Sequence, residues 1–246
     1  MRSLVAIPVF NEAEHIDDVL DRARRHAETV LVVDDGSTDG TRERLQMRRD
    51  VCVVTHARNV GYGAALRTAF RYASGHGFEG LVTLDGDGQH EPERIPQFIR
   101  TLEGCDVVSG SRYLNTFAGD TTPPPERYRI NRIISAELKQ QLHLSLSDSF
   151  CGFKAYRVSA LQEIKTRVRG YAMPLEFWVE AVAANLRIRE LPVPLLYLDE
   201  NRSFGEELDQ ADVRLAHYRD TIQSSLARTE RRRQDQTLHP ERSRIA

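Results

Sequence analysis

Five short runs rich in valine, isoleucine and leucine recur through the first half of the chain, and segments with helical spacing separate them. The runs are Leu4–Phe10, Thr29–Val33, Val51–Thr55, Gly80–Leu84 and Asp106–Ser109. Between them, apolar residues recur at three- and four-residue intervals at about 12–26, 39–48, 61–74 and 91–102. Strands that alternate with helices predict an α/β fold with a mostly parallel central sheet flanked by helices, because parallel strands need crossover connections.

The second half of the chain lacks this regular alternation, but no linker separates it from the first. After the prolines at 123–125, the spacing predicts a helix at about 126–143, a strand at Cys151–Val158, a helix at about 174–185, an extended segment at Ile188–Leu198 and a helix at about 207–228. The 246 residues, 40% of them hydrophobic, can build one large core. We therefore expect a single domain over residues 1–228. Residues 229–246 are polar and arginine-rich, which predicts a basic, disordered C-terminal tail.

Charge and cysteine content exclude several classes of function. A net charge of −2 gives no overall attraction to nucleic acid, so we expect no nucleic-acid partner. The three cysteines, Cys52, Cys105 and Cys151, lack the spacing of a zinc site and are typical of core residues in a reducing compartment. No stretch approaches the roughly 18 apolar residues of a membrane span. We therefore expect a cytoplasmic protein, at most peripheral to the cytosolic face of a membrane.

Polar clusters follow three of the predicted strands, where ligands bind in open parallel sheets. They are Pro8–Glu12, Asp34–Gly40 and Asp85–His90. The third cluster carries two carboxylates one residue apart, Asp85 and Asp87. Mg²⁺ or Mn²⁺ prefers oxygen ligands and keeps several waters, so one or two carboxylates plus substrate phosphates suffice to hold it. A plain acidic turn is the alternative, but the neighbouring clusters favour a site for a metal and a diphosphate.

Five segments in this order resemble the family-2 glycosyltransferases, whose GT-A fold binds nucleotide sugars. They are IPVFNEAEHI, VVDDGSTDGT, RNVGYGAAL, LDGDGQH and VVSGSRY. Within that family the chain is most similar to the polyprenyl-phosphate glycosyltransferases, which include the dolichol-phosphate mannosyltransferases. That narrower resemblance rests on Gly110–Tyr113, Asn131–Ser135, Asp148–Lys154 and Asn201–Arg202.

The resemblance implies which residues meet the donor. The nucleotide contacts it implies are Pro8, Phe10, Glu12, Val33 and Asp35. Asp85, Gly86 and Asp87 would bind the nucleotide sugar, with Asp85 facing its ribose or sugar. Asp87 and Gln89 would hold the metal, and His90 is a weaker candidate because a hard cation prefers oxygen.

Arginines are the expected phosphate ligands, since guanidinium groups suit phosphate oxygens in a bidentate arrangement. The resemblance places Arg112 and Arg202 near the donor diphosphate, as catalytic groups together with Asp87, and Arg132 at the acceptor phosphate. Asp148 is expected in the acceptor site; a strand cap and a general base are its other readings.

One position departs from the family pattern. Leu208 stands where the family commonly carries a lysine that approaches phosphate, and spacing alone does not show whether Arg214 compensates. The alternative for Arg127, Arg129 and Arg132 is that all three form a solvated helix face.

The function implied is an inverting, metal-dependent transfer of a hexose, mannose or glucose, from a nucleotide diphosphosugar such as GDP-mannose to polyprenyl or dolichyl phosphate. Two alternatives stay open: transfer to a saccharide or small-molecule hydroxyl, and nucleotide-sugar binding without catalysis. The QxxRW motif of processive synthases is absent from the sequence, which disfavours polymerisation. Helix faces near 126–143 or 207–228, or a separate membrane-protein partner, would bring the protein to its lipid.

Overall fold

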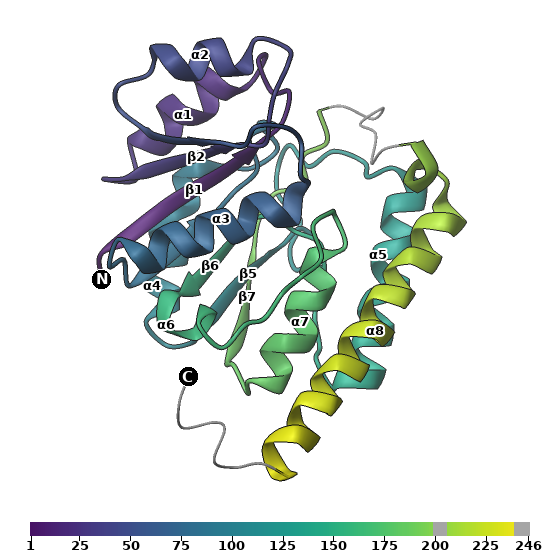
Figure 1. Ribbon diagram of the computed structural model, residues 1–246. Helices are drawn as coiled ribbons and strands as arrows, with labels where there is room; N and C mark the ends of the chain where they lie inside the picture. The colour runs from purple at the N-terminus through teal and green to yellow at the C-terminus, as the bar shows by residue number, and fades with distance from the viewer. Residues whose placement is uncertain (199–205, 239–246) are drawn as a thin grey trace.

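A seven-stranded sheet forms the centre of the computed structural model, which describes residues 1–198 and 206–238 (Figure 1). The strand order is β3-β2-β1-β4-β6-β5-β7. The strands are β1 (Ser3–Val9), β2 (Val30–Asp34), β3 (Cys52–Thr55), β4 (Gly80–Thr83), β5 (Val107–Ser111), β6 (Lys154–Arg157) and β7 (Ile188–Pro192). The predicted α/β class with a mostly parallel sheet is confirmed.

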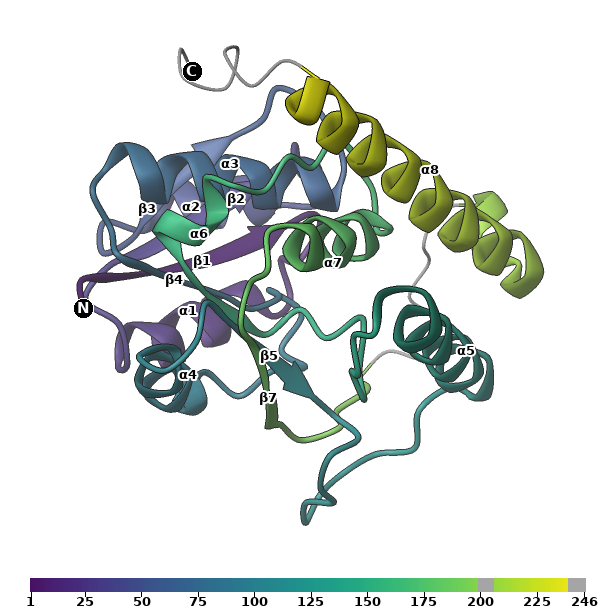
Figure 2. The ribbon, with the colours of Figure 1, turned by 90° about the horizontal axis from the view of Figure 1, so that it is seen from below.

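Helices cover both faces of this sheet. The α-helices are α1 (Ile16–Arg24), α2 (Thr41–Met47), α3 (Tyr62–Gly75), α4 (Ile95–Leu102), α5 (Pro125–Leu142), α6 (Val158–Leu161), α7 (Met173–Ala183) and α8 (Ala211–Leu238), and two 3₁₀ turns are η1 (Pro92–Arg94) and η2 (Glu206–Asp209). Helices α1 and α4 lie on one face, and α3 and α7 lie on the other (Figure 2).

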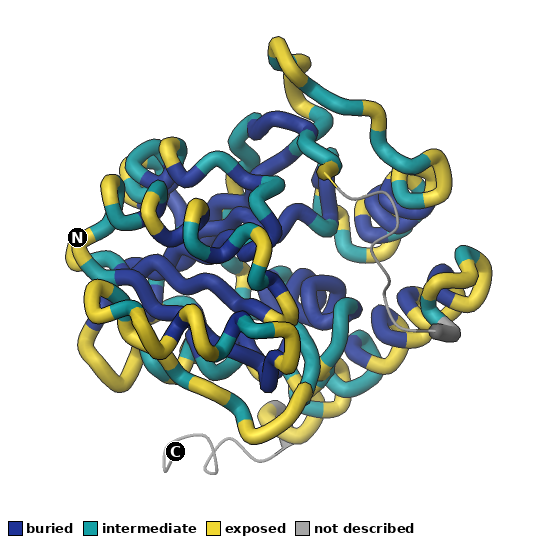
Figure 3. Tube along the Cα trace, turned by 90° about the horizontal axis from the view of Figure 1, so that it is seen from above, coloured by how far each residue is buried: buried dark blue, intermediate teal, exposed yellow. Residues whose placement is uncertain are grey.

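Side chains of the central strands alternate between the two faces, as the period of two requires. In β1, Leu4 and Ala6 join the core under α3 and α7, whereas Val5 and Ile7 join the core under α1 and α4. Buried residues accordingly run along the sheet and the inner sides of the helices, coloured dark blue in Figure 3. The sheet is therefore buried on both faces, which explains its continuous apolar runs.

Strand β6 is the reversed strand of the sheet. It runs antiparallel to both β4 and β5, with Thr83 opposite Lys154, while the other described pairings are parallel. The residues that precede β6 therefore emerge at the same edge as the residues that follow β4. Asp148 and Gly152 reach the strand-end clusters in this way.

Helix α8 packs on α7 and lies beside α5 at the outside of the molecule (Figure 1). Glu180 on α7 is buried and pairs with Arg232 at 2.7 Å, and Glu176 pairs with Arg228 one turn earlier on both helices. Residues 229–238 thus continue the helix, so the expected disorder does not hold there; residues 239–246 lie outside the described part. Arg232, which the sequence placed in the tail, thus binds a carboxylate on α7.

Most other elements match their expected positions. The exception is Ile188–Leu198, where the strand ends at Pro192 and the rest of the segment is irregular. Across residues 1–198 and 206–238, every helix falls short of the combined length and apolar character needed to cross a bilayer. The extent of the domain, 1–228, stays a prediction.

Candidate active site

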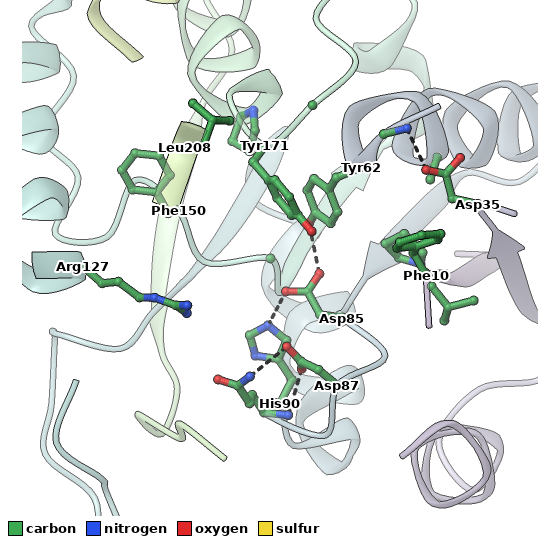
Figure 4. Close-up of a pocket in the computed structure, with 18 of the residues that line it drawn as sticks. Phe10, Asp35, Tyr62, Asp85, Asp87, His90, Arg127, Phe150, Tyr171 and Leu208 are labelled. Carbon is green, nitrogen blue, oxygen red and sulfur yellow. Dashed lines mark hydrogen bonds and ion pairs between the residues drawn. The ribbon is translucent and has the colours of Figure 1, made fainter. Parts of the chain in front are cut away.

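A cavity of about 630 Å³ opens where β1, β2 and β4 end, and it extends to α5 and α8. Of the residues expected in the site, those that line it are Pro8, Phe10, Glu12, Asp35, Asp85, Asp87, Gln89 and Arg112. Figure 4 shows Phe10 and Asp35 on one side, Asp85 and Asp87 in the middle, and Arg127, Phe150 and Leu208 on the other side. Segments from distant parts of the chain thus share one cavity.

Four of the expected residues that the structure describes do not line this cavity, and a fifth is not described. Val33 is fully buried in the core, and Gly86 packs so closely on β1 that a Cβ atom there would lie 2.7 Å from Val9 Cγ1. Arg132 is exposed on α5 and points its guanidinium at Tyr128. Asp148 is buried behind Arg112, and Arg202 lies outside the described residues.

Asp35 anchors the loop that begins α3. Its carboxylate accepts hydrogen bonds from the backbone N–H groups of Val60, at 3.0 Å, and Gly61, at 2.7 Å, and it lies 2.6 Å from His56 Nδ1. Gly61 has a φ of +106°, and a Cβ there would lie 2.5 Å from the carbonyl oxygen of Arg169. The glycine-rich segment therefore shapes the cavity, as expected, and Asp35 fixes its position. His56 had no sequence signal because its partner lies 21 residues away.

Apolar side chains also line this end of the cavity. Pro8 and Phe10 line it, and the Phe10 side chain is partly open to solvent, with 38% of the residue exposed. A ring in that position can pack against the flat face of a base. Glu12 stands beside them, with its backbone N–H donating to Thr41 Oγ1 at 2.9 Å. This end of the cavity suits a nucleoside.

Asp85 is held from two sides. Tyr62 donates its hydroxyl to Oδ1 at 3.1 Å, and His90 Nε2 lies 3.3 Å from Oδ2 (Figure 4). A Cβ on Gly152 would lie 2.2 Å from the same Oδ2, so only glycine leaves room for this carboxylate. The Nδ1 atom of His90 has no hydrogen-bond partner among the described residues. His90 therefore braces Asp85, and Tyr62 is a site residue that the sequence reasoning missed.

Asp87 closes the turn that follows. Its carboxylate accepts from the backbone N–H of Gln89 at 3.0 Å and from Gln89 Nε2 at 2.9 Å. Gly88 has a φ of +74°, a left-handed conformation that glycine adopts without strain. This tight turn presents both Asp87 and Gln89 to the cavity.

These donors fit a hard cation that is shared with a ligand. The described residues contain no cluster of three or more histidine, cysteine or acidic side chains able to enclose a metal ion. Mg²⁺ and Mn²⁺ do not need such a cluster, because they retain waters and accept phosphate oxygens. Asp87 and Gln89 are therefore suited to such an ion only when a diphosphate completes its coordination.

Asp148 is buried behind the cavity wall and pairs with Arg112, which lines the cavity. Arg112 Nε and Nη2 donate to the two carboxylate oxygens at 2.6 and 3.0 Å, and Asn131 Nδ2 donates at 2.7 Å. Burial alone would raise the pKa of Asp148, but Arg112 and these hydrogen bonds lower it to about 2. A carboxylate so occupied is a poor general base. Of the three readings of Asp148, this geometry favours the structural one, and its structural task is to orient Arg112.

The far end of the cavity is cationic and aromatic. Arg127 on α5 and Arg214 and His217 on α8 line it, among Phe150, Tyr197, Leu208 and Tyr218. Arg127 shares a helix face with Ile130 and Asn131, which also line the cavity, whereas Arg132 points away. Arg127 therefore belongs to the cavity, although in the sequence it was also consistent with a solvated helix face.

Comparisons with known proteins agree with this geometry. Residues 4–165 match the sequence model described as Glycosyl transferase family 2. The chain is 30% identical over 230 residues to undecaprenyl-phosphate mannosyltransferase of Micrococcus luteus, covering 89% of this chain and 94% of that protein. It is 28% identical over 232 residues to polyprenol monophosphomannose synthase of Mycolicibacterium smegmatis, covering 88% of this chain and 86% of that protein.

A solved structure shares the fold. Glucosyl-3-phosphoglycerate synthase from Mycobacterium tuberculosis, in complex with uridine diphosphate, matches with a TM-score of 0.69 and covers 92% of this chain and 80% of that one. The identity is 20%, so this likeness speaks for the fold alone. The fold is the GT-A fold that the sequence resemblance implied.

Proposed function

The chain belongs to glycosyl transferase family 2, and we propose that it moves a hexose from a nucleotide diphosphosugar to a polyprenyl phosphate with inversion at C1. The names of its relatives in Micrococcus luteus and Mycolicibacterium smegmatis both specify polyprenyl carriers and mannose. They support mannose as the sugar, and GDP-mannose is the donor to test first.

The observation that carries this proposal is the division of charge along the cavity. The carboxylates among the described lining residues are Glu12, Asp35, Asp85 and Asp87, all on segments that follow β1, β2 and β4. The arginines among the described lining residues are Arg112, Arg127 and Arg214, which lie on other segments of the chain. A hydroxyl acceptor needs a general base, whereas a phosphate monoester is already anionic and needs cations. The cavity therefore favours a phosphate acceptor over a hydroxyl.

The proposed reaction uses the two ends of the cavity together. The nucleoside lies against Pro8 and Phe10, and the diphosphate lies at Asp87 and Gln89. An acceptor phosphate oxygen forms a bond to C1 while the bond from C1 to the diphosphate oxygen breaks, and its electron pair leaves with the nucleoside diphosphate. A bound Mg²⁺ or Mn²⁺ would offset the charge that grows on this leaving group.

Two groups assist by position. Arg112 is held by Asp148 and lines the cavity, where its charge acts on the diphosphate or on the acceptor. We propose Arg202, which the structure does not describe, as a second diphosphate ligand. Solved structures of the Mycobacterium tuberculosis protein are complexes with Mn²⁺ or Mg²⁺ and uridine diphosphate, which supports a divalent metal here.

The test is a transfer assay with purified protein. Labelled GDP-mannose or UDP-glucose is offered with Mn²⁺ and undecaprenyl phosphate, in parallel with mannose and glycerol as hydroxyl acceptors. We expect label in the organic phase, dependent on the carrier and lost on chelation of the metal. Product only with hydroxyl acceptors would overturn the polyprenyl assignment, and donor binding without any transfer would favour a non-catalytic role.

We also propose that the protein works at the cytosolic face of a membrane, directly or through a membrane-protein partner, because the proposed acceptor is a lipid. Flotation with liposomes that contain undecaprenyl phosphate tests direct contact. Protein that remains at the bottom of the gradient with and without the carrier would leave the partner as the route to the lipid.

A further inference from the structure

Glu176 on α7 is a buried carboxylate with partners on two sides. Its side chain is fully buried, and Oε2 accepts hydrogen bonds from the backbone N–H groups of Arg167 and Val168, both at 2.7 Å. Oε1 accepts a hydrogen bond from Nη2 of Arg228 on α8. A buried carboxylate is costly unless it is paired and hydrogen-bonded, so these partners hold one another in place. Glu176 thus ties α8 to the segment that precedes α7.

The tied segment, residues 167–171, packs directly on the start of α3. The carbonyl oxygen of Arg169 accepts a hydrogen bond from the backbone N–H of Ala64 at 3.0 Å. A Cβ on Gly63 would lie 2.7 Å from the carbonyl oxygen of Val168, so glycine is what allows this close approach. The position of the first turn of α3 therefore depends on the 167–171 segment.

The start of α3 carries two contacts of the proposed donor end. The backbone N–H of Gly61 donates to Asp35 at 2.7 Å, and Tyr62 donates its hydroxyl to Asp85 at 3.1 Å. Tyr171, at the end of the tied segment, stacks its ring on that of Tyr62, with the ring centres 5.7 Å apart (Figure 4). Through α3, the segment therefore supports both carboxylates.

The next pair along the two helices reaches a different place. Glu180 and Arg232 join α7 to α8 at 2.7 Å, one turn on from the pair of Glu176, and Glu180 is also buried. Glu180 accepts a hydrogen bond from the backbone N–H of Lys165 at 3.4 Å, outside the 167–171 segment. Two similar pairs therefore fasten the same helices but contact the preceding segment at different points.

We propose that Glu176 and Arg228 are positioning residues for donor binding. Together they fix the 167–171 segment, which holds the start of α3 where Gly61 and Tyr62 meet the carboxylates. A binding site keeps its affinity only while its supporting contacts hold its groups in place. Neither residue belongs to the described lining of the cavity, so both act through other groups. The inference rests on the proposed function for the identity of the ligand, but the support of α3 is measurable without one.

The experiment compares Arg228→Met with Arg232→Met, its matched control on the same helix. Each change removes an arginine from a buried carboxylate of α7, so both should lower the thermal unfolding midpoint to a similar extent. Calorimetry in the presence of Mn²⁺ then measures the dissociation constants of GDP and UDP. For the nucleotide that the unaltered protein prefers, Arg228→Met should weaken binding roughly 3- to 30-fold, and Arg232→Met should leave it within about twofold. In the transfer assay, Arg228→Met should raise the donor KM by the same factor and change kcat less.

Hydrogen exchange without any ligand tests the support itself. Peptides that contain the N–H groups of Gly61 and Ala64 should exchange faster in Arg228→Met than in Arg232→Met, because both bonds depend on the held segment. Faster exchange there, with neither GDP nor UDP bound by the unaltered protein, would overturn the proposed function and leave the support of α3 standing. Equal nucleotide affinity in the two variants would overturn the positioning role, even where transfer to polyprenyl phosphate is intact.

Two further variants keep the test decisive if Arg228→Met does not fold. Arg228→Lys keeps the positive charge beside Glu176 and should retain nucleotide affinity to within about threefold. Arg67→Met removes a second anchor of the segment, since Arg67 Nη1 donates to the carbonyl oxygen of Arg167 at 3.0 Å, and it leaves both pairs between α7 and α8 in place. It should also weaken nucleotide binding. An unchanged dissociation constant in folded Arg67→Met would overturn the role of the segment.

Discussion

The proposed donor and acceptor ends of the cavity are built in different ways. At the donor end, Asp87 is positioned by Gln89 two residues later, within one tight turn. At the acceptor end, Arg112 is positioned by Asp148, 36 residues later, and Arg127 and Arg214 arrive on separate helices. The turn that holds Asp87 is thus a local structure at a strand end, whereas the acceptor end is a product of tertiary packing. Changes at the first should affect chemistry, and changes at the second should also affect stability.

The largest effect is expected at the donor end. Asp87→Ala removes the carboxylate proposed to hold the metal, so we expect turnover to fall at least about 1,000-fold with the fold retained. Transfer rates measured across a Mn²⁺ titration, together with circular dichroism, check this. Asp18→Ala, an exposed change on α1, is the control for losing one carboxylate. Unchanged turnover in the Asp87 variant would remove Asp87 from the mechanism.

At the acceptor end, Asp148→Asn should lower stability as well as activity. The change leaves the Arg112 guanidinium buried without its counter-charge, which costs about 3 to 5 kcal/mol of unfolding free energy. Urea denaturation measures this. The surface pair of Arg22 and Glu93 is the comparison, and Glu93→Gln should cost less than about 1 kcal/mol. Similar losses of unfolding free energy in the two variants would mean that the pair of Asp148 and Arg112 stabilises the fold no more than a surface pair does.

The same pair gives stability a pH dependence. Arg112 and hydrogen bonds outweigh burial and hold the pKa of Asp148 at about 2, below its value of about 3.9 in an unfolded chain. Its contribution, about 2 to 3 kcal/mol, is therefore complete above about pH 4 and is lost as the pH falls toward 2. Denaturation midpoints between pH 5 and pH 2 measure it, and Asp148→Asn should show a shallower decline. Equal slopes for the two proteins would contradict the assignment.

A smaller effect is expected where the donor end depends on a distant side chain. Tyr62→Phe removes the hydroxyl that donates to Asp85, which should cost about 1 kcal/mol, or roughly fivefold, in kcat/KM for the donor. The control is Tyr72→Phe on the same helix, where the ring stacks on His76. It should leave both kcat and KM unchanged. A loss seen only in the KM of the acceptor would place Tyr62 at the wrong end of the cavity.

The local nature of the donor end explains why it could be predicted from sequence. Pro8 lies near the end of β1, Asp35 and Asp87 follow β2 and β4, and the ends of parallel strands meet at one edge of the sheet. One expected residue does not have its side chain at the cavity, because side-chain direction alternates along a strand. Val33 is adjacent to that edge, but the alternation of β2 turns it into the core under α3.

The acceptor end could be predicted only in part, for the opposite reason. Arg112 was found through its motif, but the task of Asp148 depends on a contact across 36 residues that no local pattern encodes. Arg127 and Arg132 look alike in sequence, and only the packing of α5 shows which one faces the cavity. The same holds for residues 229–238. Their polar composition predicted disorder, but Arg232 pairs with a buried carboxylate of α7, a contact that composition does not reveal.

Because strand β6 is reversed, two kinds of segment reach the ligand edge of this sheet, which a wholly parallel sheet does not allow. In a parallel sheet, only the loops that follow strands reach the ligand edge, whereas here the segment that precedes β6 reaches it as well. The chain between Tyr113 and Ser147, which includes all of α5, can therefore change in length or sequence while the turns that hold the donor keep their register. One backbone can in this way exchange acceptors and retain the same donor chemistry.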